Sequence, residues 1–276
     1  MYKFFRNIGL ISFILACFLY TNKLVTVVKE YDEIMVQIKE KEKNYEINTV
    51  EAIIDEDTII PGICGKKIDI NSSYSKMRQY GKYEEKLLQY KYVDPKELLK
   101  NNKDKFIIKG NQNKKEVTLI FLINDIDKID DIIKVINKND IKANFFFKNN
   151  LINQKSYILD LINSKNIVGN LGNYDDASFL SLDKVIKKLG KQKNSYCYTE
   201  DKNKKTLEIC SKENDYTIVP NIIVDKNNLM KLKKYISNGS IISIDNIDIN
   251  TIEQLINYIK TKGYDIVTLE KLLSEK

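Results

Sequence analysis

The chain has 276 residues, of which 43% are apolar and 30% are charged, a composition typical of a globular protein and not of a disordered or fibrous one. It contains no histidine. Because histidine titrates near neutral pH and is the commonest neutral metal ligand, every histidine-based mechanism is excluded. The formal charge of +7 comes from 45 basic and 38 acidic residues. Lysines such as Lys187, Lys188, Lys191 and Lys193 are interspersed with other residue types, as on a solvated face, so we expect no nucleic-acid partner.

The N-terminus has the pattern of a membrane-directed segment. Lys3 and Arg6 precede an uncharged run over residues 7–22. These sixteen residues would form about 24 Å of helix, against a hydrocarbon thickness of roughly 30 Å, and apolar residues beyond Lys23 extend the run. We predict a cytoplasmic tip and transmembrane signal anchor over residues 1–28. The positive-inside rule then places the N-terminus in the cytoplasm and the C-terminal domain outside, in a single-pass protein of the cell membrane.

Two alternatives remain open for this segment. A cleaved signal peptide needs a small-x-small site, and the residues after the run, Thr21-Asn22-Lys23, do not form one. Ile14-Leu15-Ala16-Cys17 resembles a bacterial lipoprotein box, although Phe18 is an unusual residue after the cysteine. The uncleaved anchor is the favoured interpretation.

The cysteines give a weaker signal. Besides Cys17 the chain has Cys64, Cys197 and Cys210, and none of them has the C-x-x-C spacing that would indicate zinc. Cys197 and Cys210 could pair in an oxidising compartment. The favoured interpretation is that they are buried as small apolar side chains.

Two segments follow the anchor. Residues 29–47 combine charged helix formers with apolar residues at Ile34, Met35 and Ile38, which predicts a helical stalk. Residues 48–115 carry turn signals such as Pro61-Gly62 and short strand-like runs. They predict a small irregular or β-rich module, to which the residues assign no chemistry.

From residue 116 to residue 276 strand and helix patterns alternate. Strands are predicted over residues 117–123, 143–147, 166–169, 195–198, 216–219, 240–244 and 265–268. Helices are predicted over residues 129–136, 157–164, 182–189, 206–212, 229–235, 252–262 and 269–273. Strands with intervening helices indicate an α/β domain with a parallel sheet and right-handed crossovers, either a barrel or an open sheet.

The order of these segments resembles the polysaccharide deacetylase (NodB homology) family over residues 116–276. Four stretches carry the resemblance: Asn139–Phe147, similar to the family's second strand entry; Ile167–Asn170, similar to its I-G-N turn; and Gly239–Asp245 and Thr261–Leu269, similar to its last two strands. Upstream, Ile60-Pro-Gly-Ile-Cys-Gly-Lys-Lys is similar to the leader of a membrane-anchored bacterial subgroup. The resemblance implies a distorted (β/α) barrel with its site at the carboxyl ends of the strands.

The family's carboxylates are missing at the first strand. The family has T-F-D-D-G, where the first aspartate is the general base and the second binds the metal. This chain has Ile120-Phe-Leu-Ile-Asn124, so Leu122 stands at the base and Ile123 at the metal ligand. Neither side chain can accept a proton or coordinate a cation.

The family's histidines are missing as well. Its two metal histidines, spaced H-x-x-x-H, fall on Leu171 and Asp175, and its late acid histidine falls on Asp245. Of the three ligand positions only Asp175 keeps an oxygen donor. The family reaction needs a divalent metal such as zinc, a base and an acid. We therefore predict no bound metal, no cofactor and no family catalysis.

Acidic residues follow several predicted strands, whose loops would meet at one mouth of a barrel. They are Asp125, Asp127, Asp175, Asp176, Glu200, Asp201, Asp225, Asp245 and Asp248. Such a mouth could hold a hard cation such as calcium or attract a cationic group, including the free amine of a deacetylated sugar. The simpler reading is that these residues cap the helices that follow.

Tyrosines accompany these acids. Tyr174, Tyr196 and Tyr198 could stack on sugar rings or could be ordinary wall or core residues. The candidate ligand-binding mouth consists of Tyr174, Asp175, Asp176, Tyr198 and Asp245.

As a whole the sequence predicts a membrane-anchored, extracytoplasmic envelope protein whose deacetylase-like domain has lost the reaction. We expect a module that binds cell-wall glycan or acts as a scaffold, and the glycan link rests on the resemblance alone. One alternative is an active deacetylase with a site rebuilt around Asp175 and Asp245. Another is a structural protein that binds other membrane proteins.

Overall fold

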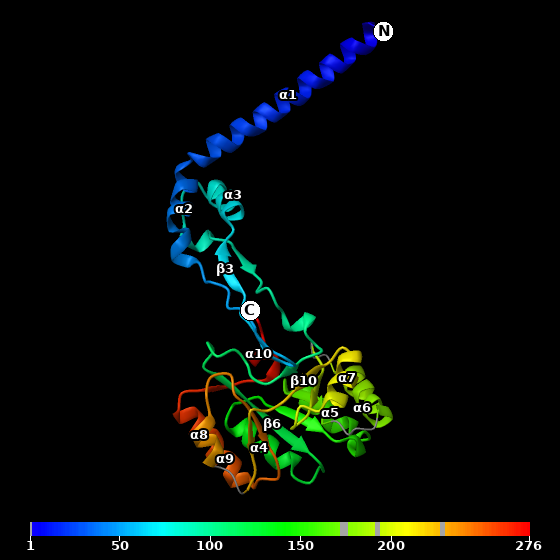
Figure 1. Cartoon of the computed structure of the whole chain (residues 1–276). Coiled ribbons are helices and arrows are strands. Elements are labelled where there is room, and N and C mark those ends of the chain that lie inside the picture. Colours follow the sequence, from blue (N-terminus) through cyan, green and yellow to red (C-terminus); the bar gives the residue numbers. More distant parts are fainter. Residues whose placement is uncertain (1, 172–175, 191–193, 227–229) are drawn as a thin grey trace. The chain divides into compact units, whose positions relative to one another are not determined.

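A computed structural model describes residues 2–171, 176–190, 194–226 and 230–276 (Figure 1). The chain divides into two compact units. Unit 1 comprises Met1–Thr49 and Cys64–Val93, and unit 2 comprises Val50–Ile63 and Asp94–Lys276. The chain therefore passes from unit 1 to unit 2, returns to unit 1 and then enters unit 2 again.

Unit 1 is built from helices and one small sheet. Its elements are α1 (Tyr2–Glu30), α2 (Glu33–Tyr45), β3 (Gly65–Ile68), α3 (Ile70–Tyr80), the 3-10 helix η1 (Glu85–Leu87) and β4 (Tyr90–Val93). Strands β3 and β4 pair antiparallel. Helix α3 ends at Gly81, whose φ of 92° is left-handed, a conformation that favours glycine at a helix C-terminus.

The segment predicted to be a stalk is helical but does not stand alone. Met35 and Ile38 of α2 are buried in one cluster with Ile68, Tyr74 and Met77. Their apolar spacing places one stripe of α2 against α3 and β3. Residues 33–45 are therefore part of a folded unit.

Helix α1 covers the segment predicted to be a membrane anchor. Its described apolar side chains are exposed, for example Ile11, Phe13 and Phe18 at 65%, 69% and 64%. In the part of the chain that the structure describes, no helix combines the length and the apolarity required to cross a membrane. The transmembrane part of the prediction over residues 1–28 is thus not supported.

Unit 2 contains the alternating elements. Its strands are β1 (Ile53–Asp55), β2 (Thr58–Ile60), β5 (Phe106–Ile107), β6 (Glu116–Ile123), β7 (Asn144–Phe147), β8 (Ile167–Asn170), β9 (Tyr196–Tyr198), β10 (Tyr216–Ile218), β11 (Ile222–Val224), β12 (Ile241–Ile244) and β13 (Asp265–Ile266). Its helices are α4 (Ile129–Lys138), α5 (Lys155–Asn163), α6 (Asp176–Leu189), α7 (Lys204–Lys212), α8 (Met230–Tyr235), α9 (Ile249–Thr261) and α10 (Leu269–Leu272), with 3-10 helices η2 (Leu99–Asn101) and η3 (Asn149–Leu151). The predicted alternation is confirmed from β6 to α10.

The strands form one curled, mixed sheet in the order β1-β2-β5-β10-β9-β8-β7-β6-β12-β11, with β13 also paired to β6. Six steps separate β10 from β11 in this order, about 29 Å in a flat sheet. The chain from Ile218 to Ile222 spans at most roughly 14 Å. The sheet must therefore curl until the end of β10 lies within this distance of the start of β11, which gives the predicted α/β class the form of a half-barrel.

The curl gives the sheet two differently covered faces. Because side chains alternate along a strand, Val117, Leu119, Phe121 and Ile123 of β6 pack with the helices, in a cluster that includes residues of α4, α5 and α9. Ile120 and Leu122 belong to the opposite face, where they meet Phe146 and Tyr198. We call this second group the inner cluster, because its members come from the strands and from the segments that close the half-barrel.

The boundaries expected at residues 48 and 116 differ from the compact units. Val50–Ile63 and the chain from Asp94 belong to unit 2, because β2 pairs with β5 and β5 pairs with β10. The rest of the expected module, Cys64–Val93, belongs to unit 1 with α2. Residues 48–115 thus contribute to both units and do not form one module.

The cysteines also differ from the favoured interpretation. Cys197 of β9 and Cys210 of α7 are both fully buried, as expected, but they form a disulfide. Cys17 and Cys64 are not in a disulfide. The pairing that the sequence left as the alternative is therefore present, and it ties α7 to the strand that it follows.

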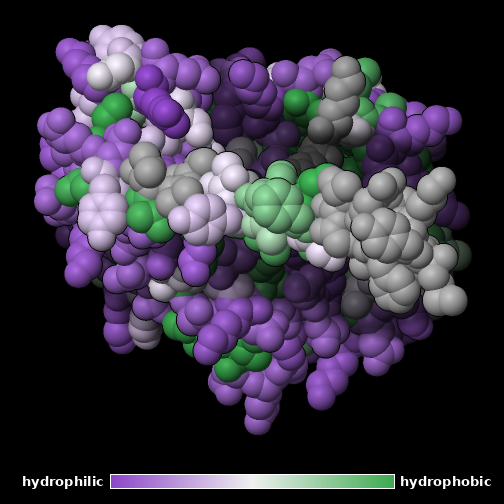
Figure 2. Space-filling view, turned by 90° about the horizontal axis from the view of Figure 1, so that it is seen from above, coloured by the Kyte–Doolittle hydropathy of each residue, from purple (hydrophilic) through white to green (hydrophobic). Residues whose placement is uncertain are grey.

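The visible surface is mostly hydrophilic, with hydrophobic side chains at scattered positions (Figure 2). This distribution agrees with the expectation that the abundant lysines lie on solvated faces.

Candidate functional site

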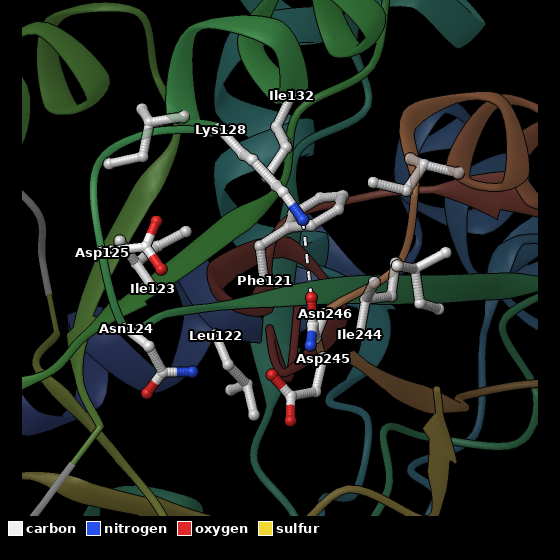
Figure 3. Close-up of a pocket in the computed structure, with 13 residues that line it drawn as sticks. Phe121, Leu122, Ile123, Asn124, Asp125, Lys128, Ile132, Ile244, Asp245 and Asn246 are labelled. Carbon is white, nitrogen blue, oxygen red and sulfur yellow. Dashed lines mark hydrogen bonds between the residues drawn. The ribbon is translucent and has the colours of Figure 1, made fainter. Parts of the chain in front are cut away.

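A pocket lies at the carboxyl ends of β6 and β12. The two strands pair in parallel up to Phe121 and Ile244, and the segments beyond these residues border a cavity of about 270 Å³ (Figure 3). Its floor is apolar and its rim is polar. The lining residues are Phe121, Leu122, Ile123, Asn124, Asp125, Lys128, Ile129, Ile132, Ile244, Asp245, Asn246, Ile247 and Ile252. We call it the strand-end pocket; pockets of this kind, where parallel strands end, commonly bind ligands.

Leu122 and Ile123 stand at the two positions where the resembled family has carboxylates. Both residues line this pocket. Leu122 is half-buried against the inner cluster. Ile123 is 3% exposed and packs with the helices on the other face of the sheet. Neither residue supplies a donor atom, so the end of β6 contributes hydrophobic contacts where the resembled family has a base and a metal ligand.

The other family positions are only partly described. Leu171 follows β8 and packs, half-buried, against the inner cluster, and its backbone N–H donates to the carbonyl of Phe147 at 2.9 Å. Tyr174 and Asp175 lie outside the described residues. Asp176 begins α6, and only its backbone is described.

The described positions do not fit a zinc site. Ile123 and Leu171 occupy two of the three ligand positions and have no coordinating atom. Over residues 2–171, 176–190, 194–226 and 230–276, no group of three or more cysteine, aspartate or glutamate side chains is close enough to hold a metal ion. No catalytic step through a metal follows from these residues.

Asp245 follows β12 and lines the strand-end pocket. Its backbone N–H donates to the carbonyl of Val224 at 3.2 Å, which fixes the residue beside β11. Its carboxylate is half-buried and accepts no hydrogen bond from any described residue. The structure therefore places a carboxylate where the resembled family has its late histidine.

Tyr198 contributes to the inner cluster rather than to an open stacking surface. It is 4% exposed, its ring lies 5.8 Å from that of Phe146, and its hydroxyl is 2.8 Å from Oγ of Ser243 and 3.4 Å from Oε1 of Glu200. Burial raises the pKa of this phenol, and the negative charges of Glu200 and Asp245 act in the same direction. Tyr198 is thus brought near Asp245 but is covered.

Tyr196 is buried as well, at 2% exposure, and its ring lies 6.0 Å from that of Tyr216. The core alternative therefore holds for both described tyrosines. A sugar that stacks on them is not compatible with their burial.

The capping interpretation holds for some acidic residues and not for others. Asp248 caps α9, because its Oδ1 accepts the N–H of Thr251 at 3.0 Å, and hydrogen bonds from Thr251 lower its pKa. Asp125 accepts the N–H of Asp127 at 3.2 Å, but the N-cap of α4 is Lys128, which makes no side-chain capping bond. Asp125 and Asp245 are therefore not accounted for as helix caps.

Three further polar residues of the pocket escaped the sequence analysis: Asn124, Lys128 and Asn246. The ammonium of Lys128 donates to Oδ1 of Asn246 at 3.5 Å, across the pocket from α4 to the segment after β12 (Figure 3). The sequence signal that could have identified these three residues is their position within five residues of a predicted strand end.

Asn149, after β7, was also missed by the sequence analysis. Its two side-chain amide atoms are buried with no partner among the described residues.

This curled α/β half-barrel has the NodB-type fold of the polysaccharide deacetylases of the CE4 family. No protein-family model matches the chain. The CE4 family pseudoenzyme BA3943 from Bacillus anthracis superposes with a TM-score of 0.65 at 22% identity, covering 89% of this chain and 96% of that one. A mutant of the same pseudoenzyme, described as having restored enzymatic activity, gives a TM-score of 0.66 at 22% identity, covering 89% and 99%.

Two other proteins complete the comparison. A family 4 carbohydrate esterase from Bacillus anthracis gives a TM-score of 0.52 at 20% identity, covering 62% of this chain and 88% of that one. The uncharacterized protein YlxY of Bacillus subtilis (strain 168) is 27% identical over an alignment of 283 positions, which covers 91% of this chain and 86% of that protein. Because an esterase and a pseudoenzyme share the fold, the fold alone does not determine what this chain does.

Proposed function

We propose that this protein is a deacetylase-like protein that does not catalyse deacetylation and that acts as a glycan-binding or scaffolding module at the cell wall. One observation carries the proposal: Leu122 and Leu171 pack against the inner cluster at two positions where the resembled family has its base and a metal ligand. Hydrolysis of an acetamide needs a polarised carbonyl and an activated water. Leucine side chains supply neither.

The glycan part of the proposal is supported by the fold and by the pocket. The superposed CE4 proteins include a carbohydrate esterase. The strand-end pocket keeps a polar rim, with Asn124, Asp125, Asp245 and Asn246, over an apolar floor. The hydroxyl groups of a sugar can form hydrogen bonds with these amide and carboxylate groups.

An extracytoplasmic location and attachment to a membrane through α1 belong to the same proposal. The disulfide between Cys197 and Cys210 supports an oxidising compartment. The exposed apolar side chains of α1, such as Phe13 and Phe18, support insertion into lipid. Cell fractionation with external protease tests this part. Recovery of the chain in the cytosol with Cys197 and Cys210 both reduced would contradict it.

An active deacetylase is the second candidate, and one observation favours it. Asp245 presents a carboxylate without a described hydrogen-bond donor inside the pocket. A rebuilt site would use this group as acid or base. It would still have to replace the ligands lost at Ile123 and Leu171.

One set of experiments separates the candidates. The purified full chain is incubated with N-acetylated glucosamine oligomers and added zinc, and free amines are measured by mass spectrometry. We expect no amine above the protein-free background. Metal-dependent turnover that Asp245→Asn abolishes would establish the active deacetylase instead. Sedimentation with isolated cell wall then divides the remaining roles: a glycan-binding module pellets with the wall, and a scaffold for other membrane proteins stays in the supernatant.

A further inference from the structure

The disulfide between Cys197 of β9 and Cys210 of α7 has a buried carboxylate beside it. Oδ2 of Asp215 lies 3.9 Å from Sγ of Cys197. The backbone N–H of Asp215 donates to the carbonyl of Cys210 at 2.9 Å, which fixes the residue against the other half of the disulfide. Both cysteines are fully buried, and Asp215 is 1% exposed. The carboxylate and the disulfide therefore share one interior site.

Three charged side chains lie near this carboxylate. On α6, the ammonium of Lys187 lies 2.9 Å from Oδ1 of Asp215 and 2.8 Å from Oδ2 of Asp183, so two buried acids share one cation. Lys103, before β5, donates to the backbone carbonyl of Asn214 and forms no ion pair with either acid. Two buried carboxylates that share one counter-charge favour the uptake of a proton.

The position of Asp215 is consistent with such a proton. Burial and the charge of Asp183 raise the pKa of Asp215 from 3.8 to about 7, against the opposing effect of Lys187. A protonated Asp215 has a hydroxyl, whereas an ionised one can only accept hydrogen bonds. The two forms therefore interact differently with the sulfur atom beside them.

The oxidised and reduced cysteines also differ in what they offer to Asp215. A disulfide sulfur carries no hydrogen and cannot donate. A thiol at Cys197 has an S–H group, which can donate to an ionised carboxylate in the same place. A hydrogen bond to the charged form of a carboxyl group favours that form. The reduced protein should therefore hold the proton of Asp215 less tightly than the oxidised protein does.

We propose that the disulfide is a redox switch whose equilibrium depends on pH, because its reduction expels the proton that Asp215 holds in the oxidised protein. A dithiol reductant supplies two electrons and two protons and is itself oxidised to a disulfide. The bond between Cys197 and Cys210 breaks, an S–H bond forms at each sulfur, and the carboxyl proton of Asp215 passes to solvent. Acidic pH thus favours the oxidised protein. Since this is an equilibrium between two folded forms, it does not depend on how the reductant reaches the buried bond.

The test is the equilibrium of the full chain with dithiothreitol at a series of pH values, approached from the oxidised and from the reduced side. Rapid alkylation and mass spectrometry count the thiols of Cys197 and Cys210 separately from those of Cys17 and Cys64. One proton is released for each disulfide reduced below pH 7. The equilibrium constant for reduction should therefore rise by about tenfold in total as the pH is raised to 7, and then level off.

Variants locate the proton. Asp215→Asn should make the equilibrium constant independent of pH over the same range, because an amide does not titrate. Asp183→Asn should keep the rise but move it to lower pH, because a charge that raises the pKa of Asp215 is removed. Asp160→Asn is the matched control, since Asp160 is an exposed aspartate on α5, and it should behave as the natural chain does.

Each remaining outcome overturns the proposal. Circular dichroism shows whether the reduced chain stays folded, and a chain that unfolds on reduction cannot bring Asp215 to the thiol of Cys197. An equilibrium constant that is the same at every pH in the natural chain rules out the coupling. A pH dependence that persists unchanged in Asp215→Asn assigns the proton to another group.

Discussion

Two pairs of carboxylates in unit 2 differ in their surroundings. Asp183 on α6 and Asp215 before β10 are 2% and 1% exposed, and the ammonium of Lys187 lies 2.8 Å from one and 2.9 Å from the other. Asp125 and Asp245 instead border a pocket and form no ion pair with a described lysine or arginine. The first group, here called the buried ion cluster, joins secondary-structure elements. The second pair is available to a ligand.

The difference separates charges that stabilise the fold from charges that the fold does not need. Burying a carboxylate is tolerated only when a partner offsets its lost hydration, and Lys187 is that partner for both acids. Asp125 is exposed and Asp245 is half-buried, so both carboxylates keep contact with solvent. Substitutions in the buried ion cluster should therefore lower the free energy of unfolding strongly, whereas substitutions in the pocket should change it little.

The largest effect is expected for Lys187→Met. Removing the ammonium leaves the buried Asp183 and Asp215 without a counter-charge. The free energy of unfolding should fall by about 3 kcal/mol, the low end for a broken buried ion pair, because Lys187 is partly exposed and Asp215 can take up a proton. The measurement is denaturant unfolding at pH 7.5. Lys188→Met is the matched control, because Lys188 is an exposed lysine on the same helix that forms no ion pair with a described residue. Equal stability of the two variants would show that the cluster does not stabilise the fold.

The disulfide beside the cluster should have the next largest effect. The sulfur of Cys197 lies 3.9 Å from Oδ2 of Asp215, and its bond to Cys210 closes a loop of 13 residues. Loop closure of this length predicts a loss of roughly 3 kcal/mol for the double change Cys197→Ser and Cys210→Ser. Unfolding with and without a reductant measures it. A natural chain that loses no stability on reduction would contradict the estimate.

The buried ion cluster should also make stability depend on pH. Burial and the neighbouring carboxylate of Asp183 raise the pKa of Asp215 from 3.8 to about 7, against the opposing effect of Lys187. The folded state therefore holds this proton more tightly than the unfolded chain. The resulting stability is fully present below pH 3.8 and is lost as the pH rises through 7.

Asp215→Asn removes this titration. Between pH 5 and pH 8 the natural chain should lose stability more steeply than the variant, when unfolding free energies are measured at intervals over that range. Parallel curves for the two proteins would refute the assignment of the titration to Asp215.

The smallest effect on stability is expected in the strand-end pocket. Asp125→Asn and Asp245→Asn should each change the free energy of unfolding by less than about 0.5 kcal/mol, because neither carboxylate has a described ion-pair partner to lose. The same unfolding experiment measures both. A loss comparable to that of Lys187→Met would mean that these groups hold the fold together, and would remove the ground for a ligand-binding role.

Much of the fold of unit 2 was predictable, because local patterns carry it. The spacing of Ile129, Ile132 and Ile136 places one stripe of α4 on the sheet, and alternating side chains of β6 divide between the two faces. Strand β11 was missed, since it begins four residues after β10 ends and Pro220-Asn221 between them has the composition of a turn. The path through both units depends on pairing between distant strands, such as β5 with β10, which no local pattern contains.

The site was predictable by position and less so by chemistry. Matching motifs located Leu122, Ile123 and Asp245 at the strand ends, where the structure has all three in one pocket. Composition could not separate the role of Asp245 from that of Asp248, because both follow the same strand. Only the hydrogen bonds to Thr251 make Asp248 a helix cap.

The central claim is that the apolar replacements have removed the reaction, and acetate release tests it most directly. The natural chain is assayed with N-acetylglucosamine oligomers and zinc, beside a variant that carries Leu122→Asp, Ile123→Asp, Leu171→His, Asp175→His and Asp245→His. We predict no acetate above background from the natural chain and zinc-dependent acetate from the variant. Zinc-dependent acetate release by the natural chain would contradict the account.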